Sequence, residues 1–163
     1  MNTVATRRQV QVAGLVQGVG FRPFIYRLAT ELDLAGSVWN TASGVTIEVQ
    51  GEAYIVDCFL ARLQAEAPPL SKILNITIED RDSIDEDGFY IIESRKDQSV
   101  HTLISPDVTV CDDCLREMFD PTDRRSRYPF INCTNCGPRF TIVRSIPYDR
   151  PGTSMAKFPM CSA

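Results

Sequence analysis

A glycine-rich run that ends in an arginine is the first group of residues able to do chemistry. It spans residues 14–22 and reads Gly-Leu-Val-Gln-Gly-Val-Gly-Phe-Arg, between a short apolar segment and a helical pattern. Glycines let the backbone turn tightly and direct its N–H groups inward, while a helix N-terminus adds partial positive charge. Arg22 adds a fixed fork of donors, so the run predicts a site for a small phosphate-bearing ligand. The alternative is a plain tight turn, with the Arg22 stem covering apolar surface.

Four of the six cysteines form a second group of this kind. They make two Cys-x-x-Cys pairs, Cys111 with Cys114 and Cys133 with Cys136, separated by 18 residues. This spacing is typical of zinc held by four thiolates, and in a reducing compartment it favours a metal over disulfides. Four sulfur ligands leave no open position for a substrate, so we expect the zinc to be structural rather than catalytic.

The other two cysteines and the single histidine need separate interpretations. Cys58 lies in a helical pattern near its apolar face, which predicts a small buried side chain. His101 lies in a polar segment and is not expected to be a ligand. Cys161 is separated from Cys136 by 24 residues. It is either a free thiol or a ligand to a second zinc in a longer protein, and we favour the second interpretation.

The elements that must position these residues are predicted from hydrophobic periodicity. Strands are expected at 9–15, 37–41, 45–51, 74–78 and 89–93, and helices at 21–32 and 56–67. Gly36 is expected to close the first helix, and Pro68-Pro69 the second. The resulting order predicts a ferredoxin-like βαββαβ fold of the α+β class, followed by a small four-cysteine zinc-finger region.

Composition limits the class of protein further. Hydrophobic residues make up 44% and charged residues 23%, which excludes a disordered tail. No apolar run is long enough to span a membrane, and the first residues lack the apolar core of a signal peptide, so a cytoplasmic location is expected. Residues 1–95 carry 8 basic and 13 acidic residues, a net charge of −5, and residues 96–163 carry 9 and 8, a net charge of +1. Neither part has the basic excess expected of a nucleic-acid-binding protein.

The glycine-rich run and a second run resemble the signature of the acylphosphatases. The second run spans residues 36–49 and reads Gly-Ser-Val-Trp-Asn-Thr-Ala-Ser-Gly-Val-Thr-Ile-Glu-Val. The resemblance implies that Arg22 and Asn40 are catalytic, with Asn40 orienting the attacking water. It implies that a phosphoryl group is bound by Leu15, Val16, Gln17, Gly18, Val19, Gly20, Phe21 and Arg22. Such hydrolysis depends on charge stabilisation and on a water held in line. The alternative for Asn40 is a residue chosen for turn chemistry.

The cysteine-containing part resembles a more specific family, the hydrogenase maturation carbamoyltransferases of the HypF type. The similar residues are 128–142, Tyr-Pro-Phe-Ile-Asn-Cys-Thr-Asn-Cys-Gly-Pro-Arg-Phe-Thr-Ile, and 147–151, Pro-Tyr-Asp-Arg-Pro. In that family an acylphosphatase-like domain precedes tandem four-cysteine zinc fingers, a YrdC-like nucleotide-binding domain and a Kae1-like domain.

The family implies a reaction sequence that begins with carbamoyl phosphate. The first domain would split it, and the YrdC-like domain would use ATP to adenylate the carbamate. The carbamoyl group would then pass to the C-terminal cysteine of a partner maturation protein, on the way to the cyanide ligands of nickel–iron hydrogenase. The ATP chemistry belongs to domains that lie outside these 163 residues.

The predicted organisation is therefore that of an N-terminal fragment. It assigns 8–95 to an acylphosphatase-like domain, 96–106 to a linker, 107–155 to a zinc finger and 156–163 to the start of a truncated second finger. Two other functions stay open. One is a stand-alone acylphosphatase of general specificity, and the other is a non-catalytic zinc-ribbon module that binds nucleic acid.

Overall fold

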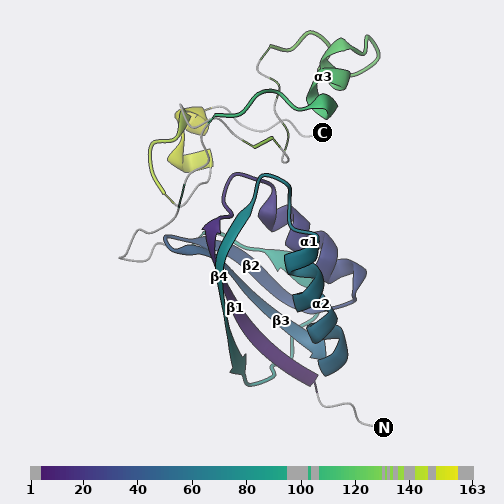
Figure 1. Ribbon diagram of the computed structural model, residues 1–163, viewed down its shortest axis with the longest axis vertical. Coiled ribbons are helices and arrows are strands. Elements are labelled where there is room, and N and C mark those ends of the chain that lie inside the picture. The colour runs from purple at the N-terminus through teal and green to yellow at the C-terminus, as the bar shows by residue number, and fades with distance from the viewer. Residues whose placement is uncertain are drawn as a thin grey trace.

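The structure of the chain is a computed structural model with a sheet-containing part and a cysteine-containing part (Figure 1). The residues that it describes are 5–94, 103, 107–129, 131, 133, 136, 137, 142–146 and 150–157. Among these residues, no helix is long and apolar enough to cross a membrane.

The first part alternates strands and helices in the predicted order. Its elements are β1 (Ala5–Leu15), α1 (Phe21–Glu31), β2 (Ala35–Thr41), β3 (Gly44–Glu52), α2 (Ala53–Ala65), β4 (Lys72–Arg81) and β5 (Phe89–Ile91). The strands form one sheet in the order β4-β1-β3-β2-β5. Neighbouring strands are antiparallel except for β2 and β5, which run parallel. The predicted ferredoxin-like α+β arrangement is confirmed.

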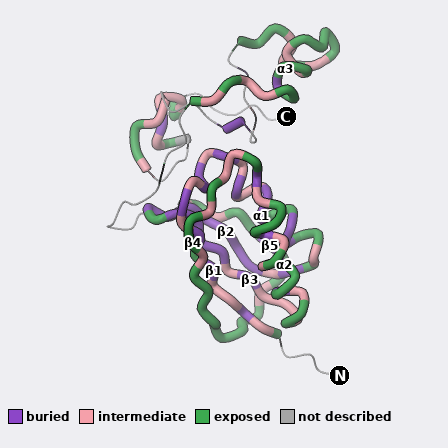
Figure 2. The backbone as a smooth tube through the Cα atoms, viewed as in Figure 1, coloured by how far each residue is buried: buried purple, intermediate pink, exposed green. Residues whose placement is uncertain are grey.

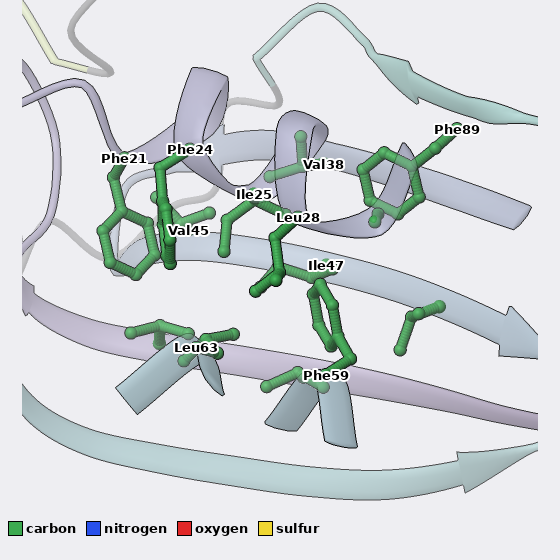
Figure 3. Close-up of a cluster of buried hydrophobic side chains, with 14 of the residues drawn as sticks. Phe21, Phe24, Ile25, Leu28, Val38, Val45, Ile47, Phe59, Leu63 and Phe89 are labelled. Carbon is green, nitrogen blue, oxygen red and sulfur yellow. The ribbon is translucent and has the colours of Figure 1, made fainter. Parts of the chain in front are cut away.

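The helices α1 and α2 cover one face of this sheet and enclose the hydrophobic core (Figure 3). The labelled core side chains come from α1, α2 and the strands, and are Phe21, Phe24, Ile25, Leu28, Val38, Val45, Ile47, Phe59, Leu63 and Phe89. Buried residues run along the central strands, whereas the edge strand β4 is largely exposed (Figure 2). Val16 and Val19 belong to the same core, so the segment between β1 and α1 is anchored by its apolar side chains.

The end of α1 differs from the prediction. The helix stops at Glu31, and Asp33 adopts the left-handed conformation with φ 54°. The N–H of Leu34 then donates to the carbonyl of Ala29 at 3.0 Å, which is the bond of a Schellman-type ending. Asp tolerates this conformation better than most residues, so glycine is not required here. Gly36 does not close the helix; it lies in β2, opposite Val49 of β3.

Two further expectations are corrected by the structure. Cys58 is exposed on α2, not buried, because the buried face of this helix is formed by Val56, Phe59 and Leu63. The second part contains a helix that periodicity did not predict, α3 (Asp112–Phe119), and two 3-10 helices, η2 (Arg150–Gly152) and η3 (Ser154–Lys157). Asp112 and Asp113 lie in the first turn of α3, where acidic side chains favour a helix.

Candidate phosphate-binding site and four-cysteine metal site

The loop between β1 and α1 has the backbone geometry expected of an anion-binding segment. Gly18 and Gly20 have φ values of 73° and 77°, in the left-handed region where a side chain is strained. Gly20 is the residue before α1, and its carbonyl accepts a hydrogen bond from the N–H of Phe24 at 3.1 Å. In the described part of the chain, the N–H groups of Val19 and Gly20 donate no backbone hydrogen bond. These donors lie beside the positive end of the helix dipole.

Arg22 follows the loop directly, in the first turn of α1. Its side chain is half-buried, and Pro23 comes next in the same turn. Pro23 has no N–H, which costs nothing at a position where the N–H has no partner within the helix. The helix therefore begins with a cation and with backbone donors that are not used by its own hydrogen bonds.

The side chain of Gln17 connects this loop to the turn between β2 and β3. It is 3% exposed, and its Nε2 donates hydrogen bonds of 2.7 Å to the carbonyls of Thr41 and Gly44. Asn40 lies immediately before this turn, opposite Val45 in the β2–β3 register, and is 1% exposed. The Oδ1 atom of Asn40 is shielded from solvent. The hydrogen bonds of Gln17 thus hold the strand end that carries Asn40 against the loop.

The predicted phosphate-binding residues occupy one continuous segment with two kinds of environment. Val16, Gln17, Val19 and Phe21 are buried, whereas Leu15, Gly18, Gly20 and Arg22 are half-buried. Sequence reasoning assigned Gln17 only a backbone role and missed its side chain. The signal was an amide side chain placed among apolar residues in a predicted loop, because a buried amide must find hydrogen-bond partners.

The four cysteines of the two pairs meet in the second part of the chain. Cys111 precedes α3 and Cys114 lies in its first turn, and the Sγ atoms of all four lie within 4.8 Å of one another. The Sγ–Sγ distance is 3.5 Å between Cys111 and Cys133, and 3.8 Å both between Cys114 and Cys136 and between Cys133 and Cys136. Sulfur atoms about 2.3 Å from a tetrahedral zinc lie about 3.8 Å apart, whereas a disulfide requires about 2.05 Å. The cluster therefore fits a metal and not a pair of disulfides.

Burial and hydrogen bonding give these thiols different proton affinities. Burial raises the pKa of Cys114, which is packed with Cys136 and Ile131. Burial alone would raise the pKa of Cys136 as well. Hydrogen bonds from backbone N–H groups, including that of Cys133 at 3.4 Å, outweigh this effect and lower the pKa to about 7. Metal binding requires all four thiols to be deprotonated. Cys161 and His101, for which the sequence made predictions, lie outside the described residues.

Comparison with known families finds a match in each of the two parts of the chain. Residues 8–91 match the Acylphosphatase family, so the chain belongs to the acylphosphatases over this range. Residues 110–143 match the HypF finger family. Taken with the relatives below, the chain corresponds more particularly to the N-terminal region of the HypF carbamoyltransferases.

The curated relatives include carbamoyltransferases from several organisms. Carbamoyltransferase HypF2 of Cupriavidus necator is 54% identical over 98% of this chain, and the probable carbamoyltransferase HypF of Methanocaldococcus jannaschii is 51% identical over 90% of it. In both cases the match covers 20% of the relative. The chain thus spans about a fifth of the length of these relatives.

Solved structures show the same correspondence. A full-length HypF in a phosphate- and nucleotide-bound form superposes with a TM-score of 0.94 and 48% identity, over 98% of this chain and 21% of that one. An acylphosphatase from Coxiella burnetii gives a TM-score of 0.51 and 32% identity, over 54% of this chain and 93% of that one. The sheet-containing part is therefore nearly a whole acylphosphatase in extent.

Proposed function

We propose that residues 8–91 hydrolyse an acyl phosphate and that the substrate is carbamoyl phosphate. In this role the domain performs the first step of carbamoyl transfer during maturation of nickel–iron hydrogenase. The observation that carries the proposal is the pair of 2.7 Å hydrogen bonds from Gln17, which hold the loop and the strand end carrying Asn40 together. The HypF relatives support carbamoyl phosphate as the particular acyl phosphate.

The proposed mechanism divides the work between two kinds of group. Arg22 and the loop N–H groups bind the phosphoryl oxygens and stabilise the charge that they carry in the transition state. Asn40 accepts a hydrogen bond from a water held in line with the bond that breaks. The water oxygen bonds to phosphorus, and the carbamate leaves with the electron pair of the P–O bond. The proton lost by the water ends on the phosphate.

We infer that the metal of the four-cysteine site is zinc with a structural role. Cys111, Cys114, Cys133 and Cys136 supply the four thiolates that zinc prefers in such sites. Because the set is complete, the zinc stabilises the second part of the chain and does not contact substrate. A second zinc bound through Cys161 remains a prediction for a longer protein.

The carbamate released by this domain needs activation before it can be transferred. In the proposed sequence, a YrdC-like domain of the longer protein uses ATP for this step, and a Kae1-like domain passes the carbamoyl group to the C-terminal cysteine of an acceptor protein. The share of the relatives that lies beyond this chain leaves room for such domains.

The proposal is tested by phosphate release from carbamoyl phosphate. Replacing Arg22 by alanine removes the cation beside the transferred group, so we expect kcat/KM to fall by about 10²-fold or more. Arg27→Ala is the matched control, because Arg27 is an exposed arginine on the same helix and should leave the rate unchanged. Equal rates for the two variants, with both folded, would refute the role of Arg22.

The choice of substrate and the binding alternative need separate measurements. If the domain serves carbamoyl transfer, kcat/KM for carbamoyl phosphate should exceed that for acetyl phosphate, whereas a general acylphosphatase would not prefer the carbamoyl group. The nucleic-acid alternative expects binding of a labelled oligonucleotide that weakens with salt, together with no turnover. That outcome would contradict the proposed function as a whole.

A further inference from the structure

A glycine of the cysteine-containing part lies against the phosphate loop. Gly137 follows Cys136, is buried, and adopts a left-handed conformation with φ 67°. Its N–H donates a hydrogen bond of 2.9 Å to the carbonyl of Cys133, which closes the turn of the second cysteine pair. We call Cys133, Cys136 and Gly137 the knuckle. The part of the chain with α3, η2 and η3 lies at the end of the sheet where β1 leads into α1 (Figure 1).

The contact between the knuckle and the loop is made backbone to backbone. A Cβ atom at position 137 would lie 1.8 Å from the carbonyl oxygen of Gly18 and 3.0 Å from its carbonyl carbon. A C=O bond is about 1.2 Å long, so these two distances place the Cβ position on the extension of that bond. The carbonyl of Gly18 therefore points directly at Gly137. Only a glycine leaves space for it.

The direction of this carbonyl fixes the direction of a neighbouring donor. In a trans peptide the N–H of the next residue points opposite to the C=O, so the N–H of Val19 points away from the knuckle. This N–H donates no backbone hydrogen bond within the described residues. If the Gly18–Val19 peptide turned over, its carbonyl oxygen would replace the N–H and repel an anion.

We propose that Gly137 is a positioning residue for the phosphate site. The knuckle accepts the Gly18 carbonyl and thereby keeps the Val19 N–H directed toward the bound phosphoryl group. Metal binding by the cysteines holds the knuckle, so it also holds this peptide. The proposal rests on the proposed function of the loop, and it adds a role for the four-cysteine site in phosphate binding.

Gly137 has a second possible reason to be glycine, namely its positive φ. The variant Gly137→Asn separates the two reasons, because asparagine tolerates the left-handed region but carries a Cβ. The matched control is Gly88→Asn. Gly88 has a φ of 70°, and a Cβ there would meet only the flexible side chain of Tyr90, at 3.3 Å. A difference between these variants reports the contact with Gly18 and not the backbone conformation.

The experiment uses the whole 163-residue chain loaded with zinc. Amide chemical shifts of Val19 and Gly20 are followed by NMR, and affinity is measured by titration with inorganic phosphate. For Gly137→Asn with its metal retained, we expect both amides to shift and the phosphate Kd to rise about tenfold, the effect of losing one hydrogen bond to a charged group. Gly88→Asn should leave these shifts and the Kd unchanged.

The other possible results of this experiment also test the positioning role of Gly137. Unchanged loop amides and an unchanged Kd in metal-loaded Gly137→Asn overturn the proposal. If that variant loses its metal, the amide shifts of the wild-type chain are compared with and without a chelator instead. Amide shifts of Val19 and Gly20 that do not change when the metal is removed would also overturn the proposal. If the wild-type chain binds no phosphate, the proposed function fails, but the amide shifts still test the coupling between knuckle and loop.

Discussion

Arg22 and Asn40 reach the candidate site from different elements and bring different chemistry. In the proposed mechanism, Arg22, in the first turn of α1, contributes a charge that attracts phosphate both before and during the reaction. Asn40 is buried near the end of β2, and we propose that its neutral amide acts on the water and not on the bound phosphate. Loss of the arginine should therefore weaken both binding and turnover, whereas loss of the asparagine should spare binding.

Asn40→Ala tests this division at the residue scale. We expect kcat for carbamoyl phosphate to fall by about 10²-fold, because the water loses its orientation, while the Kd for inorganic phosphate changes little. Steady-state kinetics and a phosphate titration measure the two quantities. Asn75→Ala, at an exposed position on β4, is the control. A weaker phosphate Kd with an unchanged kcat contradicts the assigned role.

At the scale of elements, the site depends on the joining of two segments that are separate in the sequence. The loop after β1 supplies donors, and the turn between β2 and β3 places Asn40. Gln17 connects them through two carbonyls, those of Thr41 and Gly44. The carbonyl of Gly44 also accepts a longer bond of 3.4 Å from the Thr41 hydroxyl.

Gln17→Leu tests this connection. The leucine keeps a buried side chain of similar size but removes both hydrogen bonds of the Gln17 amide, so we expect a loss of about 1–3 kcal/mol in the free energy of unfolding. The phosphate Kd should rise as well, because the loop is no longer held against the turn. Urea denaturation and phosphate titration measure these effects. Gln64→Leu, on the exposed side of α2, should change stability by less than about 0.5 kcal/mol.

The elements also show what could be predicted from the sequence. Strands and helices of the sheet-containing part were predictable because their apolar residues repeat with clear periods over seven or more residues in most elements. The helix α3 was missed because it has only eight residues and lies in a proline-punctuated region. Cys58 was misplaced because it lies about 200° around the helix from Val56, away from the buried stripe.

The candidate site was predictable only in part. Motif residues located the loop, Arg22 and Asn40, since their types and order carry the resemblance. The Gln17 hydrogen bonds and the contact between Gly18 and Gly137 join residues far apart in the chain. Such contacts depend on tertiary packing, which no local pattern of residues contains.

At the scale of the whole molecule, the two parts are stabilised in different ways. The sheet-containing part has a continuous core of apolar side chains between one sheet face and two helices. The described residues of the second part pack a much smaller cluster, Cys114, Ile131 and Cys136, around the sulfur atoms. We therefore expect the second part to depend on its metal for its fold.

Metal analysis tests this dependence. We expect about one zinc per chain, and Cys114→Ser should reduce the zinc content, because the buried thiolate cannot be replaced equally well by a hydroxyl. Cys58→Ser is the matched control, since Cys58 is exposed on α2 and away from the cluster. Elemental analysis after purification without chelator gives the zinc content. A chain that holds no zinc, or Cys114→Ser with full zinc content, contradicts the assignment.

The contact between Gly18 and Gly137 also has a consequence for the order of folding. It joins the loop after β1 to a turn that lies far along the chain, so closing it costs more conformational entropy than forming the local contacts of the sheet. The sheet and its helices contain their own contacts and are able to form earlier. If Gly137 positions the loop as proposed, the phosphate loop reaches its final conformation after the sheet has formed, and we expect a newly synthesised chain to bind phosphate more weakly before it has acquired its metal.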